Sequence, residues 1–146
     1  MNKEELIRIY SAYLPYELTI TDVTNNQEFI LEPENISGVL NDAEHLNTLK
    51  PHLYDLSYLT KEIEHEGRKI VPVEYFEITD DSDSYPIEHD HGNFKLIKDL
   101  ESIAKNNSYH DIQFLPFETV QRLISFHINV FGLKEDQFIN KATLNK

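Results

Sequence analysis

Apolar residues recur with a helical period near both ends of this chain, and this pattern constrains the fold more than any other feature. The segment from Lys3 to Leu14 predicts a helix whose apolar face is formed by Leu6, Ile9 or Tyr10, Tyr13 and Leu14. Pro15 should end this helix, because proline lacks the N–H that a helix interior needs. A second helix should begin near Pro116, end before Gly132 and bury one side formed by Phe117, Val120, Ile124, His127, Ile128 and Phe131.

Between these helices, parts of the sequence alternate as strands do. Glu17 to Val23 and Gln27 to Leu31 predict a hairpin, since Asn25-Asn26 between them tolerates positive φ. Lys69 to Ile78 is rich in Ile, Val, Tyr and Phe and predicts a strand, in which Pro72 would occupy an edge or bulge position.

Two more helices and two loops are predicted in the same region. One helix should be capped by Asp55 or Ser57, close at Gly67 and share the face Leu56, Leu59 and Ile63. Another should run from Phe94 to Asn106. Thr79 to Gly92 predicts a solvated acidic loop, and Glu32 to Asn47 predicts a loop or a short helical turn.

The order of these elements predicts the α+β class, with a small antiparallel sheet packed against several helices. The chain has 146 residues, of which 40% are hydrophobic, and this suits a single globular domain spanning residues 1–146. We expect an acidic loop at residues 79–92 and a tail that is only partly ordered from residue 133.

The chain is strongly acidic, with a formal net charge of −13. From Ile70 to Phe94 it has no Lys or Arg, but it carries seven carboxylates: Glu74, Glu77, Asp80, Asp81, Asp83, Glu88 and Asp90. Such a strip repels nucleic acid and anionic lipid, and it attracts basic protein surfaces or cations. A direct nucleic-acid ligand is not expected, because Lys and Arg supply most of the affinity for phosphate. The alternative is a solvated face that only keeps the protein soluble.

Several groups of residues could carry chemistry. Glu88-His89-Asp90-His91 offers ligands for a divalent transition metal, but successive residues rarely converge on one ion, so a solvated turn competes with this interpretation. His110-Asp111 and His127 could act in acid–base catalysis, and a satisfied core histidine is the alternative for His127. Neither a nucleophile elbow nor a phosphate-binding glycine loop is present in the sequence. We predict no catalytic residue, no metal site and no cofactor.

The sequence contains no cysteine, which suits a reducing cytoplasm. Its first residues lack the apolar run of a secretory signal, and no 18 apolar residues run together. We therefore expect a cytoplasmic protein without a membrane partner.

Three parts of the sequence resemble a family of small phage and prophage proteins of Bacteroidota. These parts are Leu6 to Tyr16, Leu49-Lys50-Pro51 together with Leu56 to Glu64, and Leu115 to Leu133, and they cover about half of the chain. The resemblance implies a phage origin and a shared fold, and the family has no established catalytic motif. Thr79 to His91 departs from the family spacing and resembles an insertion. By class alone, a small acidic phage protein without cysteine is similar to anti-CRISPR proteins, including those that act on type VI effectors.

These observations lead to the hypothesis of a non-enzymatic phage accessory protein that acts in the cytoplasm of a host bacterial cell. It would bind and inhibit or perturb a host protein with a basic nucleic-acid-binding groove, such as a CRISPR effector ribonucleoprotein. The predicted partner-binding residues are Asp80, Asp81, Asp83, Tyr85, Glu88 and Asp90. One alternative is a phage structural or assembly protein, and another is a metal-dependent enzyme built on His89, Asp90 and His91.

Overall fold

The computed structural model describes residues 3–35, 38, 48–79 and 86–144, and the chain divides into two compact units. The first unit combines residues 1–54 with residues 131–146, and the second comprises residues 55–130. The secondary structure is mixed α+β, as the sequence predicts. That the whole chain forms one domain remains a prediction.

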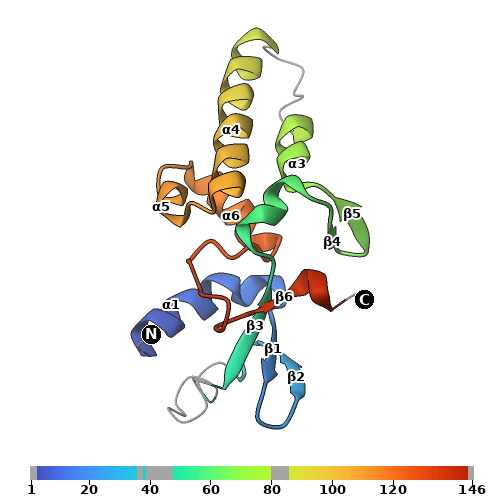
Figure 1. Cartoon of the computed structure of the whole chain (residues 1–146), viewed down its shortest axis with the longest axis vertical. Coiled ribbons are helices and arrows are strands. Elements are labelled where there is room, and N and C mark those ends of the chain that lie inside the picture. The colour runs from blue at the N-terminus through green and yellow to red at the C-terminus, as the bar shows by residue number, and fades with distance from the viewer. Residues whose placement is uncertain (1–2, 36–37, 39–47, 80–85, 145–146) are drawn as a thin grey trace. The chain divides into compact units, whose positions relative to one another are not determined.

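A four-stranded sheet organises the first unit, in the order β2-β1-β3-β6 (Figure 1). β1 (Thr19–Asp22) pairs antiparallel with β2 (Gln27–Ile30) and with β3 (Leu49–Leu53). β6 (Ile139–Asn140) is parallel to β3, so the sheet is mixed and the expectation of a purely antiparallel sheet is corrected. The strand comes from the tail, where two residues give no local signal that a sequence pattern could detect.

The β1–β2 hairpin confirms the sequence prediction. Its turn places Asn26 at φ 61, and the Asn25 side-chain oxygen accepts a hydrogen bond from the backbone N–H of Gln27 at 3.0 Å. Asparagine tolerates this left-handed conformation better than most residues. Most of the region from Glu32 to Asn47, where a loop or short turn is predicted, lies outside the described residues.

Helix α1 (Lys3–Tyr13) also forms as predicted and leads into the short 3₁₀ helix η1 (Leu14–Tyr16), which contains Pro15. Its buried residues recur at helical spacing: Leu6, Ile9, Tyr10 and Tyr13. The Tyr13 ring meets the Phe131 ring edge-on, with their centroids 5.8 Å apart. After β6, the 3₁₀ helix η3 (Lys141–Thr143) completes the described part of this unit.

The second unit combines a hairpin with helices (Figure 1). Its elements are η2 (Leu56–Thr60), β4 (Ile63–His65), β5 (Arg68–Ile70), α3 (Pro72–Thr79), α4 (Pro86–Asn106), α5 (Tyr109–Ile112) and α6 (Phe117–Ser125). Helix α4 packs against η2 and α3, and the α4 residues Leu100 and Ile103 are buried.

The segment that begins at Asp55 differs from the single helix predicted for it. Of the two capping residues that the sequence allows, Asp55 is the one used: its carboxylate accepts a hydrogen bond from the backbone N–H of Ser57 at 2.8 Å and caps η2. The chain then forms the β4–β5 hairpin, whose turn residues are Glu66 at φ 51 and Gly67 at φ 78. Two residues with positive φ suit the twist of a tight hairpin. Gly67 is left-handed, as expected, but it closes a hairpin instead of a helix.

The strand predicted from Lys69 to Ile78 is wrong beyond Ile70. Helix α3 begins at Pro72, and the Val71 carbonyl accepts a hydrogen bond from the backbone N–H of Glu74 at 2.9 Å. Proline at the first helical position and a carboxylate in the first turn both favour a helix start.

The acidic loop predicted at residues 79–92 is also wrong in part, because α4 already begins at Pro86. The predicted helix from Phe94 to Asn106 is confirmed and begins about two turns earlier, at Pro86. It ends as expected, with Asn107 at φ 51 and the backbone N–H of Ser108 bonded to the Ile103 carbonyl at 3.1 Å. This is the bond of a Schellman cap, in which Asn107 takes the left-handed position usually held by glycine.

The last predicted helix is shorter than its apolar pattern indicates, and the face that it buries is a different one. Helix α6 ends at Ser125, because His127 adopts φ 62 and the backbone N–H of Ile128 bonds to the Leu123 carbonyl at 3.1 Å. These are the features of a Schellman cap, in which His127 takes the position usually held by glycine. Buried residues of the helix are Thr119, Leu123, Ile124 and Ser125, whereas Phe117 is exposed.

Candidate interaction surface

The structure places only some of the predicted partner-binding residues. Glu88 and Asp90 lie in α4, together with His89 and His91. The remaining predicted residues, Asp80, Asp81, Asp83 and Tyr85, lie outside the described part of the chain. Their role in binding therefore stays a prediction.

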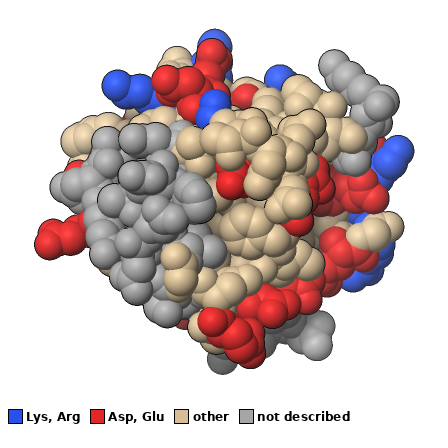
Figure 2. All heavy atoms as spheres, turned by 90° about the horizontal axis from the view of Figure 1, so that it is seen from below, with Lys and Arg blue, Asp and Glu red and all other residues tan. Residues whose placement is uncertain are grey.

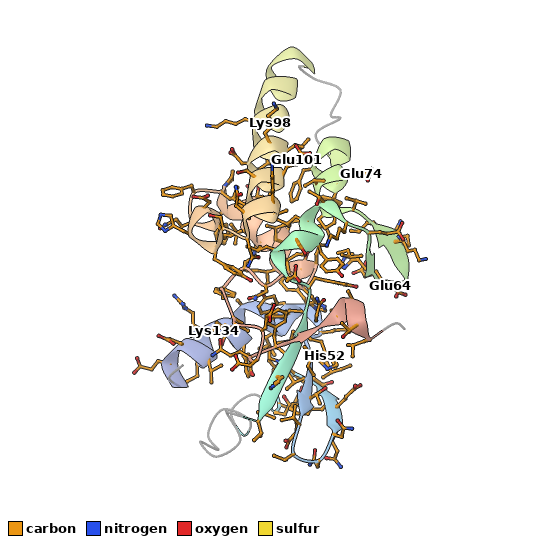
Figure 3. The ribbon with its side chains drawn as sticks, in the orientation of Figure 1. His52, Glu64, Glu74, Lys98, Glu101 and Lys134 are labelled. Carbon is orange, nitrogen blue, oxygen red and sulfur yellow. The ribbon has the colours of Figure 1, made fainter. Side chains whose placement is uncertain are left out.

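Acidic side chains elsewhere are spread over several elements. On the face shown in Figure 2 they form several separate groups, and some of these groups lie beside Lys or Arg. In the second unit, Glu64, Glu74 and Glu101 come from β4, α3 and α4, and all three are exposed (Figure 3). An ion pair joins Lys69 Nζ and a Glu62 oxygen at 3.9 Å, but exposed pairs of this kind stabilise a fold by only about 0–1 kcal/mol. Exposed carboxylates of the second unit thus come from several different elements.

A short apolar segment between α5 and α6 stands out from this acidic surface. We call residues 114–117 the Phe114–Phe117 turn; it has the sequence Phe-Leu-Pro-Phe. Phe114 is 73% exposed and Phe117 is 77% exposed, the two highest values among the large hydrophobic residues described as exposed. Single exposed apolar residues are ordinary on protein surfaces, but two phenylalanines within four residues point to a contact surface.

Backbone hydrogen bonds fix the Phe114–Phe117 turn on both sides. The N–H of Phe114 bonds to the Asp111 carbonyl at 3.1 Å, and the N–H of Leu115 bonds to the Ile112 carbonyl at 3.0 Å. Pro116 is extended, with φ −56 and ψ 146, and its carbonyl accepts the N–H of Val120 at 3.1 Å to start α6. Proline restricts φ at this point, so the turn has little freedom to change shape.

Side chains around the turn add order and charge. The His110 ring meets the Phe114 ring edge-on at 5.7 Å between centroids, and a His110 ring nitrogen lies 3.1 Å from the Gln113 amide nitrogen. Asp111 accepts a hydrogen bond from the Ser108 hydroxyl at 2.7 Å. His110 and Asp111 thus have different partners, which gives no support to the catalytic pairing considered from the sequence. Asp111 and Glu118 are exposed on either side of the turn.

An aromatic cluster on the neighbouring elements explains how α6 is oriented. The Phe126 ring contacts His65 at 4.8 Å and Tyr75 at 5.3 Å between centroids, so the end of α6 is joined to β4 and α3. The Arg122 guanidinium lies over the Tyr75 ring at 5.0 Å, a cation–π contact. These contacts secure the face that carries Leu123 and leave Phe117 exposed.

The Phe114–Phe117 turn is not predicted by the sequence pattern. Phe117, Val120 and Ile124 follow a helical period that predicts a buried face, whereas Phe117 is exposed, and Phe114 lies outside this pattern. One feature of the sequence does indicate the turn. Pro116 stands between two phenylalanines and marks the start of the helix, so Phe117 lies in the first helical turn and Phe114 lies before it.

The sheet of the first unit contains a polar pair of a different kind. Thr21 Oγ1 and His52 Nε2 lie 2.6 Å apart, and these residues are only 5% and 4% exposed. His52 lies on β3, where Figure 3 labels it. Thr21 lies on β1, directly opposite Glu28 on β2 and Lys50 on β3. Burial lowers the pKa of His52, the Glu28 charge opposes this effect and the Lys141 charge adds to it. A hydroxyl beside an imidazole can act in catalysis, but both of these residues are buried, and we interpret the pair as a structural contact between two strands of the sheet.

Across the described part of the chain, no group of three or more His, Asp or Glu side chains is arranged to hold a metal ion. The side chains of His89, Asp90 and His91 lie outside that part of the chain. The described helices also include none with the length and hydropathy needed to cross a membrane. Comparisons with protein-family models, with curated proteins and with solved structures give no match to this chain.

Proposed function

We propose that this chain is a non-enzymatic binding protein that docks on the basic, nucleic-acid-binding surface of another protein. The observation that carries the proposal is that its charge cannot be neutralised internally. The chain has 26 Asp and Glu but 13 Lys and Arg, so 13 carboxylates would remain even if every base formed one ion pair. Such a surface attracts Lys and Arg side chains that otherwise contact phosphate, and it steers their approach. Docking there would exclude nucleic acid from the partner.

The partner class is a host nucleic-acid-handling protein, with a CRISPR effector ribonucleoprotein as the specific case. This part of the proposal is supported by the resemblance to phage and prophage proteins and by the class likeness to anti-CRISPR proteins. The protein would then act in the cytoplasm of the host cell.

Affinity capture tests the proposal. The tagged protein is incubated with a bacterial host lysate at low and at high salt, with and without excess heparin, and bound proteins are identified by mass spectrometry. We expect nucleic-acid-binding proteins that are released by heparin and by salt, because both compete for the same cationic groups. Binding that neither heparin nor salt reduces would contradict the proposal.

A pair of charge-reversed variants then tests where the contact lies. The first replaces with Lys the five predicted carboxylates, namely Asp80, Asp81, Asp83, Glu88 and Asp90. The second replaces with Lys five exposed carboxylates of the first unit, namely Glu4, Glu32, Glu34, Glu135 and Asp136. Each set changes the net charge from −13 to −3, so the two variants have the same charge and differ in the location of the change. We expect the first variant to lose more binding than the second, and equal losses would mean that net charge alone acts.

A further inference from the structure

We propose that the Phe114–Phe117 turn is the apolar anchor of this interface, and that it inserts into an apolar pocket bordered by Lys or Arg on the partner protein. The inference rests on the proposed function, because it identifies partner-contacting residues of that same activity. Charges at the rim of an interface mainly set the association rate, whereas affinity comes from a few residues that become fully buried. An acidic binder therefore needs an anchor of a different chemical kind.

The two phenylalanines have the size and position of such an anchor. Their backbones can be no more than about 11 Å apart, since three extended residues span that distance. Each aromatic side chain can remove roughly 150–250 Å² from water. Other exposed apolar residues are smaller and less exposed: Val23 is 45% exposed and Ile30 is 46% exposed. The Phe114–Phe117 turn is thus the strongest apolar contact that the described surface offers.

The turn is also ordered before binding. Hydrogen bonds from the N–H groups of Phe114 and Leu115 fix its first half, and Pro116 and the start of α6 fix its second half. The His110 ring contacts one edge of Phe114. A surface that is already in its bound shape loses little conformational entropy on association, so more of the contact energy appears as affinity.

Charge decides which occupant fits the turn. Asp111 and Glu118 border it, and the whole chain carries −13. A second copy would place like charges opposite one another in a two-fold contact. Anionic lipid and nucleic acid would also be repelled. A protein pocket bordered by Lys or Arg pairs with both carboxylates, and its cations can also stack on the exposed phenylalanine faces.

Two synthetic peptides of equal charge serve as probes. The first is a 14-residue amphipathic helix of Leu and Lys, and the second has the same Lys positions with Ser in place of Leu. Binding is measured by fluorescence anisotropy with the natural sequence, with the Phe114→Ser/Phe117→Ser variant and with the matched Val23→Ser/Ile30→Ser variant. We expect the Leu–Lys peptide to bind the phenylalanine variant at least about 30-fold more weakly, the size of a hot-spot loss. The Leu–Lys peptide should bind the Val23→Ser/Ile30→Ser variant about as tightly as the natural sequence. The Ser–Lys peptide should bind all three proteins with similar affinity.

The outcomes separate this inference from the proposed function. If the Ser–Lys peptide binds in a salt-dependent way but the Leu–Lys peptide loses nothing in the phenylalanine variant, the anchor is refuted and the electrostatic function stands. If neither peptide binds the natural sequence, both are refuted. Sedimentation that shows a dimer dissolved by the phenylalanine variant would assign the turn to self-association. A lower urea midpoint of that variant would show that the chain itself covers the rings, and this too would overturn the inference.

Discussion

Tyr10 provides a sharp test of packing in the first unit. Its side chain is completely buried on α1, and its hydroxyl oxygen has no hydrogen-bond partner among the described residues. Burial raises the pKa of Tyr10 to about 12, because the phenolate form is disfavoured away from water. Tyr10→Phe removes only the hydroxyl and keeps the ring, so it tests whether this group is a net cost to folding.

The expected effect has two parts with different pH dependence. At neutral pH the variant should be as stable as the natural sequence or more stable, by up to about 1–3 kcal/mol, the cost of an unsatisfied buried polar group. Above pH 10 the natural sequence should lose further stability. Tyr10 ionises near pH 10 in the unfolded chain but only near 12 in the folded chain, so the stabilisation is present below pH 10 and disappears between these values. At pH 11 the loss is about 1.4 kcal/mol, and the phenylalanine variant does not share it.

Urea unfolding at pH 8 and pH 11 measures both parts. Tyr109→Phe is the matched control, because the Tyr109 hydroxyl accepts a hydrogen bond from Asn129 Nδ2 at 3.2 Å. That variant should lose about 1 kcal/mol at pH 8. If Tyr10→Phe lost a similar amount at pH 8, the Tyr10 hydroxyl would have a partner. If its stability difference were the same at both pH values, the hydroxyl would be solvated and the reasoning would fail.

Three further substitutions test other parts of the fold, each by urea unfolding. Thr21→Val should lower the free energy of unfolding by about 1–3 kcal/mol at pH 7.5, because it leaves the buried His52 ring nitrogen without its hydroxyl partner. An unchanged free energy of unfolding would show that the 2.6 Å contact contributes nothing to stability. The natural sequence should lose stability as the pH falls below about 6.5, since the folded state disfavours protonated His52, and His52→Gln should weaken this dependence; an unchanged profile would contradict it. Gly67→Ala should cost about 1 kcal/mol through backbone strain at φ 78, because no atom lies within 4 Å of the added Cβ; a neutral result would mean that the turn relaxes.

Local signals predicted the elements whose residues all favour one structure. α1 combines a regular apolar face with Pro15 at its end, and the β1–β2 hairpin combines alternation with two asparagines in its turn. The end of α4 at Asn106 follows in the same way. In each case the periodicity and the residue that ends the element agree, so tertiary contacts had no conflict to resolve.

The wrong predictions have particular physical causes. Residues 69–78 combine strand-favouring side chains with Pro72 and Glu74, which favour a helix start, and the burial of Val73 and Phe76 on one helix face decided between them. Strand propensity is a weak preference that packing can override. β6 could not be predicted, because its pairing with β3 joins residues more than 80 positions apart and depends on contacts that no local pattern contains.

The error at Phe117 is of another kind, and it bears on function. Packing explains the error at α3, because the helix buries the residues that a strand would have divided between two faces. Phe117 brings no comparable burial of apolar surface. Tyr75 and Phe126 contact each other on the other side of α6, whereas the Phe117 side chain is exposed, as is that of Phe114. A large apolar side chain in this position does not help the unit to fold. Residues that break a local rule without a structural benefit are those most expected to serve function, so the failed sequence prediction and the proposed anchor meet at the same residue.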